Sequence, residues 1–296
     1  MVCISRRGDG PYFRPGIPQA AVPRAKSRPV VTQRVDGQRL YHIVNGSIAS
    51  DRTAVRRTTN APNKNPQERK TEMERTPLAL RVLPSYSPAE EKFNMISHIV
   101  GGGFSVIATA LCIVFAAIRS DAWAVVSAAV YGVSMMTLYV MSSIYHGLPA
   151  RLLGKRVFQV MDHCAVFLLI AGSYTPYCLC TLRRASPALG WVYFGIVWGL
   201  TVLAITLNAI DLKRYEIFSN IATLLLGWCI IVQAPTVIRE IGQAGFLLLL
   251  SGGIAYSAGA VLYVLGARRR GFHAVFHLFV LVGSILQFFS IFFFVL

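Results

Sequence analysis

Residues 272–295 read FHAVFHLFVLVGSILQFFSIFFFV, an apolar run without a single charged side chain. As an α-helix that rises about 1.5 Å per residue, this run is long enough to cross about 30 Å of hydrocarbon. Its first turns nevertheless contain His273 and His277, which lie four residues apart and therefore share one helix face. An imidazole at membrane depth costs free energy unless it has a partner. The segment therefore predicts both a membrane span and a functional site.

Six further apolar runs of similar length precede this one. The chain of 296 residues is 54% hydrophobic and only 14% charged, and its mean hydropathy is +0.53, which excludes an ordinary soluble domain. The seven predicted spans are 95–118, 123–145, 157–179, 188–208, 217–238, 245–266 and 272–295. Short loops make neighbouring helices antiparallel. We expect an all-α polytopic membrane protein, a seven-transmembrane helix bundle over residues 86–296, in which the small residues Ser251, Ala255 and Gly259 give the sixth span a close-packing face.

The first 85 residues have a different composition. They are rich in Arg, Pro, Thr, Asn and Gln and lack apolar periodicity, which predicts a disordered basic tail over residues 1–85. No apolar segment near Met1 resembles a secretory signal, although the Arg-rich start has a weak likeness to a transit peptide. A start of translation at Met73 is an alternative, because the composition changes soon after it.

Loop charges predict the orientation of the bundle. With a cytoplasmic N-terminus, the inner loops hold eight basic residues, namely Arg151, Lys155, Arg156, Lys213, Arg214, Arg268, Arg269 and Arg270. The outer loops hold four, namely Arg119, Arg183, Arg184 and Arg239. Because cytoplasmic loops carry the excess of Lys and Arg, we expect the N-terminus inside, the C-terminus outside, and a place in the plasma membrane. The net charge of +16 is then a topology signal and not a nucleic-acid surface, so no nucleic-acid partner is expected.

This topology brings the unusual polar residues to one depth. They are Asn94 and His98 near the start of the first span, Ser142 and His146 at the end of the second, Asp162 and His163 in the third, and His273 and His277 in the last. Five of the six histidines, and the only acidic residue within a span, thus gather near the cytoplasmic leaflet.

These residue types suit a zinc site. His273 and His277 can grip one ion from one helix face, and His146 from another helix completes a set of three that leaves a position for water. Asp162 can accept a proton from that water or orient it, and Ser142 can donate a hydrogen bond to a developing oxyanion. Simpler roles are an ion pair between Asp162 and a loop arginine, and a hydrogen bond from Ser142 to its own helix.

The ordered set of these motifs resembles a known family. It comprises Glu91-Lys92-Phe93-Asn94, Ser97-His98, Ser142-x-x-x-His146, Asp162-His163, Ser173-Tyr174-Thr175-Pro176 and His273-x-x-x-His277. In this order on seven spans, it is similar to the hemolysin III family, which is related to the progestin and adiponectin receptors and more distantly to alkaline ceramidases. The likeness covers roughly residues 85–296. It implies zinc on His146, His273 and His277 with Asp162 and Ser142 adjoining, and the other motif residues Glu91, Asn94, His98 and His163 are candidates for supporting them.

Three functions fit these observations. The first is an intramembrane zinc-dependent hydrolase of lipid amide or ester bonds, whose substrate enters from the bilayer. The second is a pore-forming cytolytic protein, against which stands the nearly apolar outer half of the spans. The third is a receptor-like regulator of membrane lipids with structural zinc. A retinal protein is excluded because the spans contain no lysine. The sequence leaves the substrate and the oligomeric state open.

Overall fold

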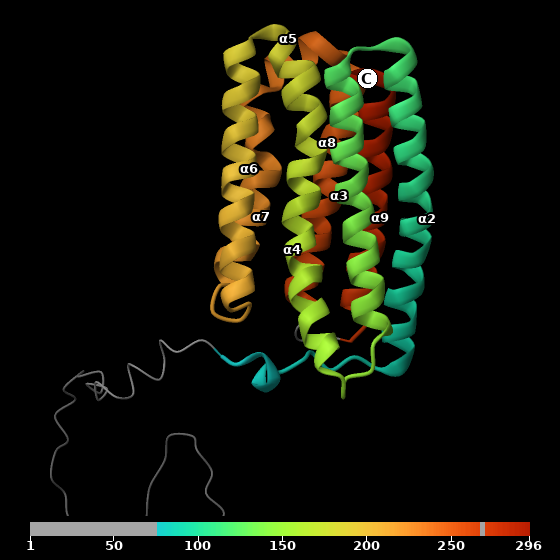
Figure 1. Ribbon diagram of the computed structural model, residues 1–296, viewed down its shortest axis with the longest axis vertical. Helices are drawn as coiled ribbons and strands as arrows, with labels where there is room; N and C mark the ends of the chain where they lie inside the picture. The colour runs from blue at the N-terminus through green and yellow to red at the C-terminus, as the bar shows by residue number, and fades with distance from the viewer. Residues whose placement is uncertain (1–75, 267–269) are drawn as a thin grey trace, which may run out of the picture. The chain divides into compact units, whose positions relative to one another are not determined.

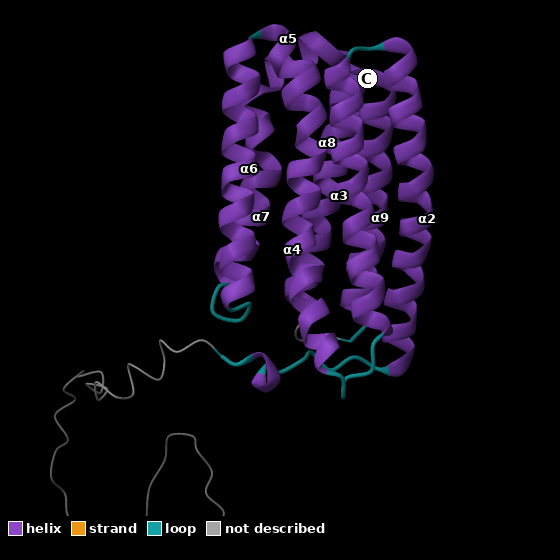
Figure 2. Ribbon diagram, in the orientation of Figure 1, coloured by secondary structure: helices purple, strands orange, loops and turns teal. Residues whose placement is uncertain are grey.

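The structure is a computed structural model that describes residues 76–266 and 270–296, and these residues form helices and turns with no strand among them (Figure 1, Figure 2). The long helices are α2 (Pro88–Arg119), α3 (Ala122–Gly147), α4 (Leu153–Pro176), α6 (Pro187–Ile210), α7 (Glu216–Trp228), α8 (Ala234–Gly266) and α9 (Phe272–Ser290). The shorter ones are η1 (Leu78–Leu80), η2 (Tyr177–Leu182), α5 (Arg183–Ala185), η3 (Cys229–Gln233) and η4 (Ile291–Val295). The all-α prediction is confirmed. The predictions about a tail over residues 1–75 and a start at Met73 lie outside the described residues.

Six helical stretches are long and apolar enough to cross a membrane, and one of them contains two of the predicted spans. That stretch, Glu216–Gly266, is 51 residues long. Its backbone leaves the helical conformation at Gly242, whose φ of 73° favours glycine, and the Trp228 indole donates a hydrogen bond to Ser257 Oγ at 2.9 Å. In one straight helix these two residues would be about 43 Å apart. The stretch therefore folds back on itself, which accommodates the predicted seven crossings, although their number stays a prediction.

Helix α2 begins seven residues before the predicted start of the first span. Ser87 caps it: Ser87 Oγ accepts a hydrogen bond from the Glu90 N–H at 3.2 Å, and Glu90 Oε2 accepts one from the Ser87 N–H at 2.8 Å. Pro88 occupies the first helical turn, where its missing N–H costs nothing. Because hydropathy does not register this cap, the sequence prediction placed the start too late. The additional two turns bring Glu91 and Asn94 into the helix.

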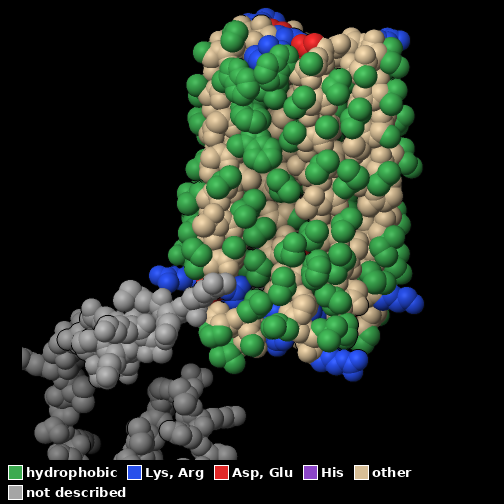
Figure 3. All heavy atoms as spheres, viewed as in Figure 1, with side chains coloured by type: hydrophobic (Ala, Val, Ile, Leu, Met, Phe, Trp, Pro, Cys, Tyr) green, Lys and Arg blue, Asp and Glu red, His purple; other side chains and the backbone are tan. Residues whose placement is uncertain are grey.

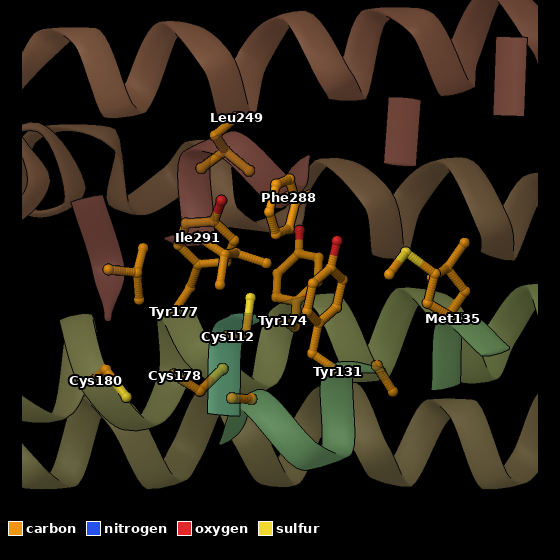
Figure 4. Close-up of a cluster of buried hydrophobic side chains, with 14 of the residues drawn as sticks. Cys112, Tyr131, Met135, Tyr174, Tyr177, Cys178, Cys180, Leu249, Phe288 and Ile291 are labelled. Atoms are coloured by element: carbon orange, nitrogen blue, oxygen red, sulfur yellow. The ribbon is translucent and has the colours of Figure 1, made fainter. Parts of the chain in front are cut away.

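Helix α4 continues through Pro176 into the widened turn η2, so the helical stretch ends at Ala185 and not at 179 as expected. Proline cannot donate the hydrogen bond that an α-helix requires, and a π-type turn is one way for the backbone to adapt. The Thr175 hydroxyl donates to the Ala171 carbonyl oxygen at 2.8 Å beside this irregularity. The adjustment turns Tyr177 into the core (Figure 4).

Close approaches hold the first three long helices together. A Cβ atom on Gly132 of α3 would lie 2.2 Å from Thr109 Oγ1 of α2, and one on Gly172 of α4 would lie 2.4 Å from Ser134 of α3. Only glycine fits at such contacts. The apolar core that results, drawn in Figure 4, contains the buried thiol of Cys112.

The close-packing face of α8 differs from the prediction at one of its three residues. Ala255 and Gly259 are buried as expected, but Ser251 is exposed and Gly252 takes its place. A Cβ atom on Gly252 would lie 3.0 Å from Gln287 Nε2 of α9. The sequence pattern identified the correct helix but not which residue began its inner face, because neighbouring small residues satisfy the spacing equally well.

The second half of α9 carries a buried polar network, which we call the hydroxyl ladder. Its members are Ser284, Gln287 and Ser290 of α9 with Tyr139, Tyr177 and Tyr256 from other elements. Tyr139 donates to Ser284 Oγ at 2.8 Å, and the Tyr177 hydroxyl lies 2.8 Å from Ser290 Oγ and 3.2 Å from Gln287 Oε1. The sequence analysis expected the outer halves of the spans to be nearly apolar. In α9 this expectation holds for the exposed surface of the helix but not for its buried face.

The outer surface of the bundle is apolar over most of its height. In Figure 3 hydrophobic side chains cover the visible face, and Lys and Arg side chains gather at its two ends. Ile118, Val106 and Leu225 are between 57% and 75% exposed, which in water would be an unfavourable surface. This distribution fits a bundle whose flank faces lipid.

Residues 76–85, which the sequence analysis assigned to the tail, have contacts with the helices. The Thr76 N–H donates to Asp211 Oδ2 at 3.1 Å, and Arg156 Nε donates to the Arg81 carbonyl oxygen at 3.0 Å. The segment reads TPLALRVLPS and is mostly apolar, and its backbone groups find partners at the ends of α4 and α6. The boundary between tail and bundle at residue 86 stays a prediction.

Candidate metal centre

Three histidines converge at the end of the bundle where α3 stops and α9 begins. His277 Nε2 lies 3.2 Å from His146 Nε2 and 3.0 Å from His273 Nε2. All three side chains are buried, with at most 8% of each residue exposed. The predicted grouping of His146 with the i, i+4 pair on α9 is therefore what the fold produces, and each ring presents the same nitrogen to the others.

The arrangement fits a metal ion. Two nitrogens that bind one tetrahedral zinc at 2.0–2.1 Å are separated by about 3.3 Å, close to the distances found between the Nε2 atoms. One ligand atom from each ring lies within 4.8 Å of the others, so a single ion can reach all three. Neutral imidazoles that aim lone pairs at one point repel one another unless a cation or a proton lies between them. The donor set is that of zinc sites with an open position.

Glu91 and Lys155 orient His146 from behind. Glu91 Oε2 lies 2.7 Å from His146 Nδ1, and Glu91 Oε1 accepts a hydrogen bond from Lys155 Nζ at 2.7 Å. Lys155 is itself 3% exposed and also donates to the Leu148 carbonyl oxygen at 2.9 Å. A carboxylate on Nδ1 leaves Nε2 free to bind metal and fixes the plane of the ring. Sequence reasoning placed Glu91 near the site but missed Lys155, which it read only as a loop charge.

His98 performs the same role for His277. His98 Nε2 lies 2.5 Å from His277 Nδ1, and the two rings are perpendicular. If His277 Nε2 carries the lone pair, its Nδ1 carries the proton and donates to His98. His98 Nδ1 and both polar atoms of the Asn94 amide are buried without a hydrogen-bond partner among the described residues. These two residues on adjacent turns of α2 thus retain unused polar capacity beside the histidines.

Asp162 and Ser142 lie next to the three histidines. The Asp162 carboxyl is close enough to His146, His163 and the Ser142 hydroxyl to interact with each of them. Ser142 Oγ is fully buried, and no group in the described part of the chain forms a hydrogen bond of good geometry with it. A hydroxyl in that situation is available to a ligand. His163 faces Tyr263, with ring centroids 6.0 Å apart, and it does not join the three converging rings.

Aromatic side chains enclose the histidines, and the sequence analysis did not identify them. The Tyr86 ring stacks on His273 with centroids 4.7 Å apart, Tyr145 lies 4.6 Å from His146, and Tyr263 lies 5.8 Å from His273. Burial raises the pKa of the Tyr86 phenol, so at neutral pH this group remains protonated and can donate a hydrogen bond. Tyr86 precedes α2, where no periodic pattern marks a residue as part of a site.

A cavity of about 480 Å³ opens from the histidines into the bundle. Its polar end includes His98, Asp162, His163, His273 and His277. The remaining wall is mostly apolar and reaches Gln287 of the hydroxyl ladder, and it includes Val166, Phe167, Leu169, Ile170, Phe246, Leu249 and Val280. A cavity that is largely apolar and carries polar groups beside the histidines matches the chemistry of a lipid chain with a polar head.

Comparison with known proteins identifies the relatives of this chain. A family model described as "Haemolysin-III related" matches residues 86–288. The chain belongs to this haemolysin III family. It is 40% identical over 207 residues to Hemolysin-3 of Bacillus cereus, a match covering 70% of this chain and 92% of the relative. The Hemolysin-3 homolog of Bacillus subtilis (strain 168) is 36% identical over 205 residues, covering 69% and 94%.

A more distant relative is the human monocyte to macrophage differentiation factor, which is 23% identical over 181 residues, or 59% of this chain and 72% of that protein. The resemblance inferred from the ordered motifs is confirmed. Together with the apolar helices, membership of the haemolysin III family makes this an integral membrane protein.

Proposed function

We propose that this haemolysin III protein is an intramembrane zinc-dependent hydrolase that cleaves an amide or ester bond of a lipid. One observation carries the proposal: three Nε2 atoms with zinc-like spacing lie beside a largely apolar cavity that His273, His277 and Asp162 line. A site that only stabilised the bundle would not need the cavity.

His146, His273 and His277 would hold the ion, with Glu91 and His98 keeping two of the rings in place. Bound zinc supplies a Lewis acid that lowers the pKa of a coordinated water towards about 7. Asp162 is the residue that takes up a proton, because it is the carboxylate that lines the cavity beside the histidines. Ser142 donates a hydrogen bond to the developing oxyanion. Asn94 and His163 complete the polar surroundings.

Membrane lipids are the partners that this arrangement suits. The apolar wall would receive an acyl chain that enters from the bilayer, and the scissile bond would stop at the histidine end. We place that end at the cytoplasmic leaflet of the plasma membrane, because the loops beside it carry the larger share of Lys and Arg. Cysteines introduced at Lys213 and Arg184 test this orientation. Labelling of position 213 by an impermeant reagent outside intact cells would reverse it.

The test of the hydrolase combines metal analysis with lipid turnover. Detergent-purified protein should hold one zinc per chain and release fatty acid from ceramides, acyl-amides or phospholipids. Asp162→Asn should retain zinc and lose turnover, since an amide cannot take up the proton. Ser142→Ala should cost about 10–100-fold in turnover, as one weaker oxyanion hydrogen bond. A zinc-loaded wild-type protein that cleaves none of these lipids would favour a regulator in which the metal is structural.

A second candidate function is suggested by the names of the relatives. Two of them are called Hemolysin-3 or its homolog, so a pore-forming, cytolytic activity is the alternative. Insertion would need the apolar helices and not the metal. Lysis of erythrocytes that persists in the triple variant His146→Ala, His273→Ala, His277→Ala would therefore support the pore and separate it from hydrolysis.

A further inference from the structure

Arg81 is a buried cation at the mouth of the cavity. It lies between η1 and α2, and only 7% of the residue is exposed. Its Nη2 donates to the Ile210 carbonyl oxygen at 2.7 Å, and its Nε lies 3.4 Å from the Thr76 carbonyl oxygen. Nη1 is buried and has no hydrogen-bond partner within residues 76–266 and 270–296. The guanidinium thus retains unused donors on a group that is always charged.

The nearby carboxylate of Asp211 forms no hydrogen bond with this cation. Asp211 Oδ2 accepts the Thr76 N–H at 3.1 Å, and Asp211 Oδ1 accepts the N–H groups of Lys213 and Arg214 at 3.1 and 3.3 Å. Asp211 is close enough to feel the charge of Arg81, but it makes no hydrogen bond to the guanidinium. A buried charge without a hydrogen-bonded counter-ion is costly, so a ligand that supplies one stabilises the folded protein.

Arg81 is one of the residues that line the cavity beside the histidines. Arg81 lines this cavity together with Thr76, Asn208, Lys213 and Ser219, which make one end of it polar. Arg81 and Lys213 are cationic, and the carboxylates Asp211 and Glu216 line the same cavity. Arg156 of α4 is held close by its hydrogen bond to the Arg81 backbone. Because the Asp211 oxygens already accept backbone N–H groups, the open donor in this region is Arg81 Nη1, and its natural ligand is a negatively charged oxygen.

We propose that Arg81 binds the phosphate of an anionic phospholipid whose acyl chain extends into the cavity. A guanidinium presents paired N–H donors that match phosphate oxygens, and basic pockets between membrane helices suit anionic headgroups. The apolar wall of the cavity favours a phosphate that carries a lipid chain over a free one. This site does not depend on hydrolysis, since a lipid can occupy it as substrate or as a structural ligand.

The experiment measures lipid-dependent stability of the full chain in nanodiscs. Wild-type protein is compared in phosphatidylcholine alone and in phosphatidylcholine mixed with phosphatidylglycerol, and bound lipid is counted by native mass spectrometry. We expect phosphatidylglycerol to bind in preference and to raise the melting temperature. Arg81→Gln should lose this preference and weaken phosphatidylglycerol binding at least tenfold, whereas Arg239→Gln, at an exposed arginine paired with Glu240, should not.

Three outcomes would overturn the proposal. The first is wild-type protein that binds both lipids equally. The second is an Arg81→Gln protein that retains zinc, and is therefore folded, yet prefers phosphatidylglycerol as before. The third is equal stabilisation by inorganic phosphate alone, which would assign the site to free phosphate. If Arg81→Gln does not fold, Arg81→Lys is the test. Lysine keeps the positive charge but lacks the paired N–H donors of the guanidinium, so the preference for phosphatidylglycerol should weaken without disappearing.

Discussion

The two halves of α9 are both polar on their buried face, yet they differ in how the polar atoms are paired. In the first half His277 presents Nε2 to the Nε2 atoms of His146 and His273. With His146 Nδ1 donating to Glu91, neutral rings can make only one of these two contacts a hydrogen bond. In the second half each hydroxyl of the hydroxyl ladder has a complementary partner, down to the Ser290 hydroxyl, which donates to the Gly245 carbonyl oxygen at 2.8 Å. Polarity alone therefore does not mark a site. Convergent groups that cannot satisfy one another do.

This contrast also explains why the cavity offers open polar groups beside the histidines but few beside the hydroxyl ladder. The ladder uses its hydroxyls within the bundle, as in the contact of 3.0 Å between Tyr256 and Ser284, and offers little to a ligand. The histidine end keeps open groups on Ser142, Asn94 and His98. A satisfied network fixes how helices pack, whereas an unsatisfied one leaves binding capacity.

The largest expected difference between the halves is in metal binding. His277→Ala should lower zinc affinity by more than about 100-fold, because loss of a supporting residue alone typically costs 10–100-fold. Ser284→Ala, on the same helix, should leave zinc content unchanged. Chelator competition on the purified proteins measures both. Equal zinc loss in the two variants would mean that zinc binding depends on both halves of α9.

The next effect concerns the support of His146. Glu91→Gln removes the charge that holds His146 Nδ1 and Lys155 Nζ, and it should reduce zinc affinity about 10–100-fold. Lys155→Met should act in the same direction by freeing the carboxylate to rotate. Glu240→Gln, at an exposed ion pair, is the control. Unchanged zinc affinity in both Glu91→Gln and Lys155→Met would show that the Glu91 contact does not contribute to metal binding.

A smaller effect is expected in the ladder. Tyr139→Phe removes the hydrogen bond to Ser284 Oγ while keeping the ring, and it should lower the free energy of unfolding by about 1 kcal/mol. Tyr139 also contacts the His98 ring edge-on. A change in zinc affinity in this variant would therefore show that the hydroxyl ladder affects the histidine site. A double-mutant cycle with Ser284→Ala isolates the contact. A coupling energy near zero would show that the ladder bond contributes nothing.

The smallest effect lies at the cavity mouth, outside the spans. Burial alone would raise the pKa of Asp211, but N–H donors from Thr76 and Arg214 outweigh it and lower the pKa below its ordinary value. Stability from this carboxylate is therefore present above the unfolded pKa of about 3.9 and is lost as pH falls through the folded pKa. Hydrogen exchange at Thr76 should be faster in Asp211→Asn than in wild type at pH 7. The difference should vanish in acid, and a constant difference would contradict the pKa assignment.

Much of the architecture could be predicted from local patterns. Apolar runs located the long helices because the cost of placing charge in lipid is a property of each segment by itself. The i, i+4 spacing placed His273 and His277 on one face, and the ordered motifs identified the family. Errors appeared where the decisive contact was short-range but not apolar, as at the Ser87 cap of α2, or where equivalent small residues competed, as at Ser251 and Gly252.

By itself, the sequence determined the helices, the family and the three histidines, since each follows from composition or spacing within a few residues. Only the tertiary structure decided that Lys155 supports Glu91, that Tyr86 stacks on His273, and that Arg81 keeps a free donor at the cavity mouth. These contacts join residues that lie far apart along the chain. Their partners depend on helix rotation and side-chain rotamers, which the packing of the whole bundle selects.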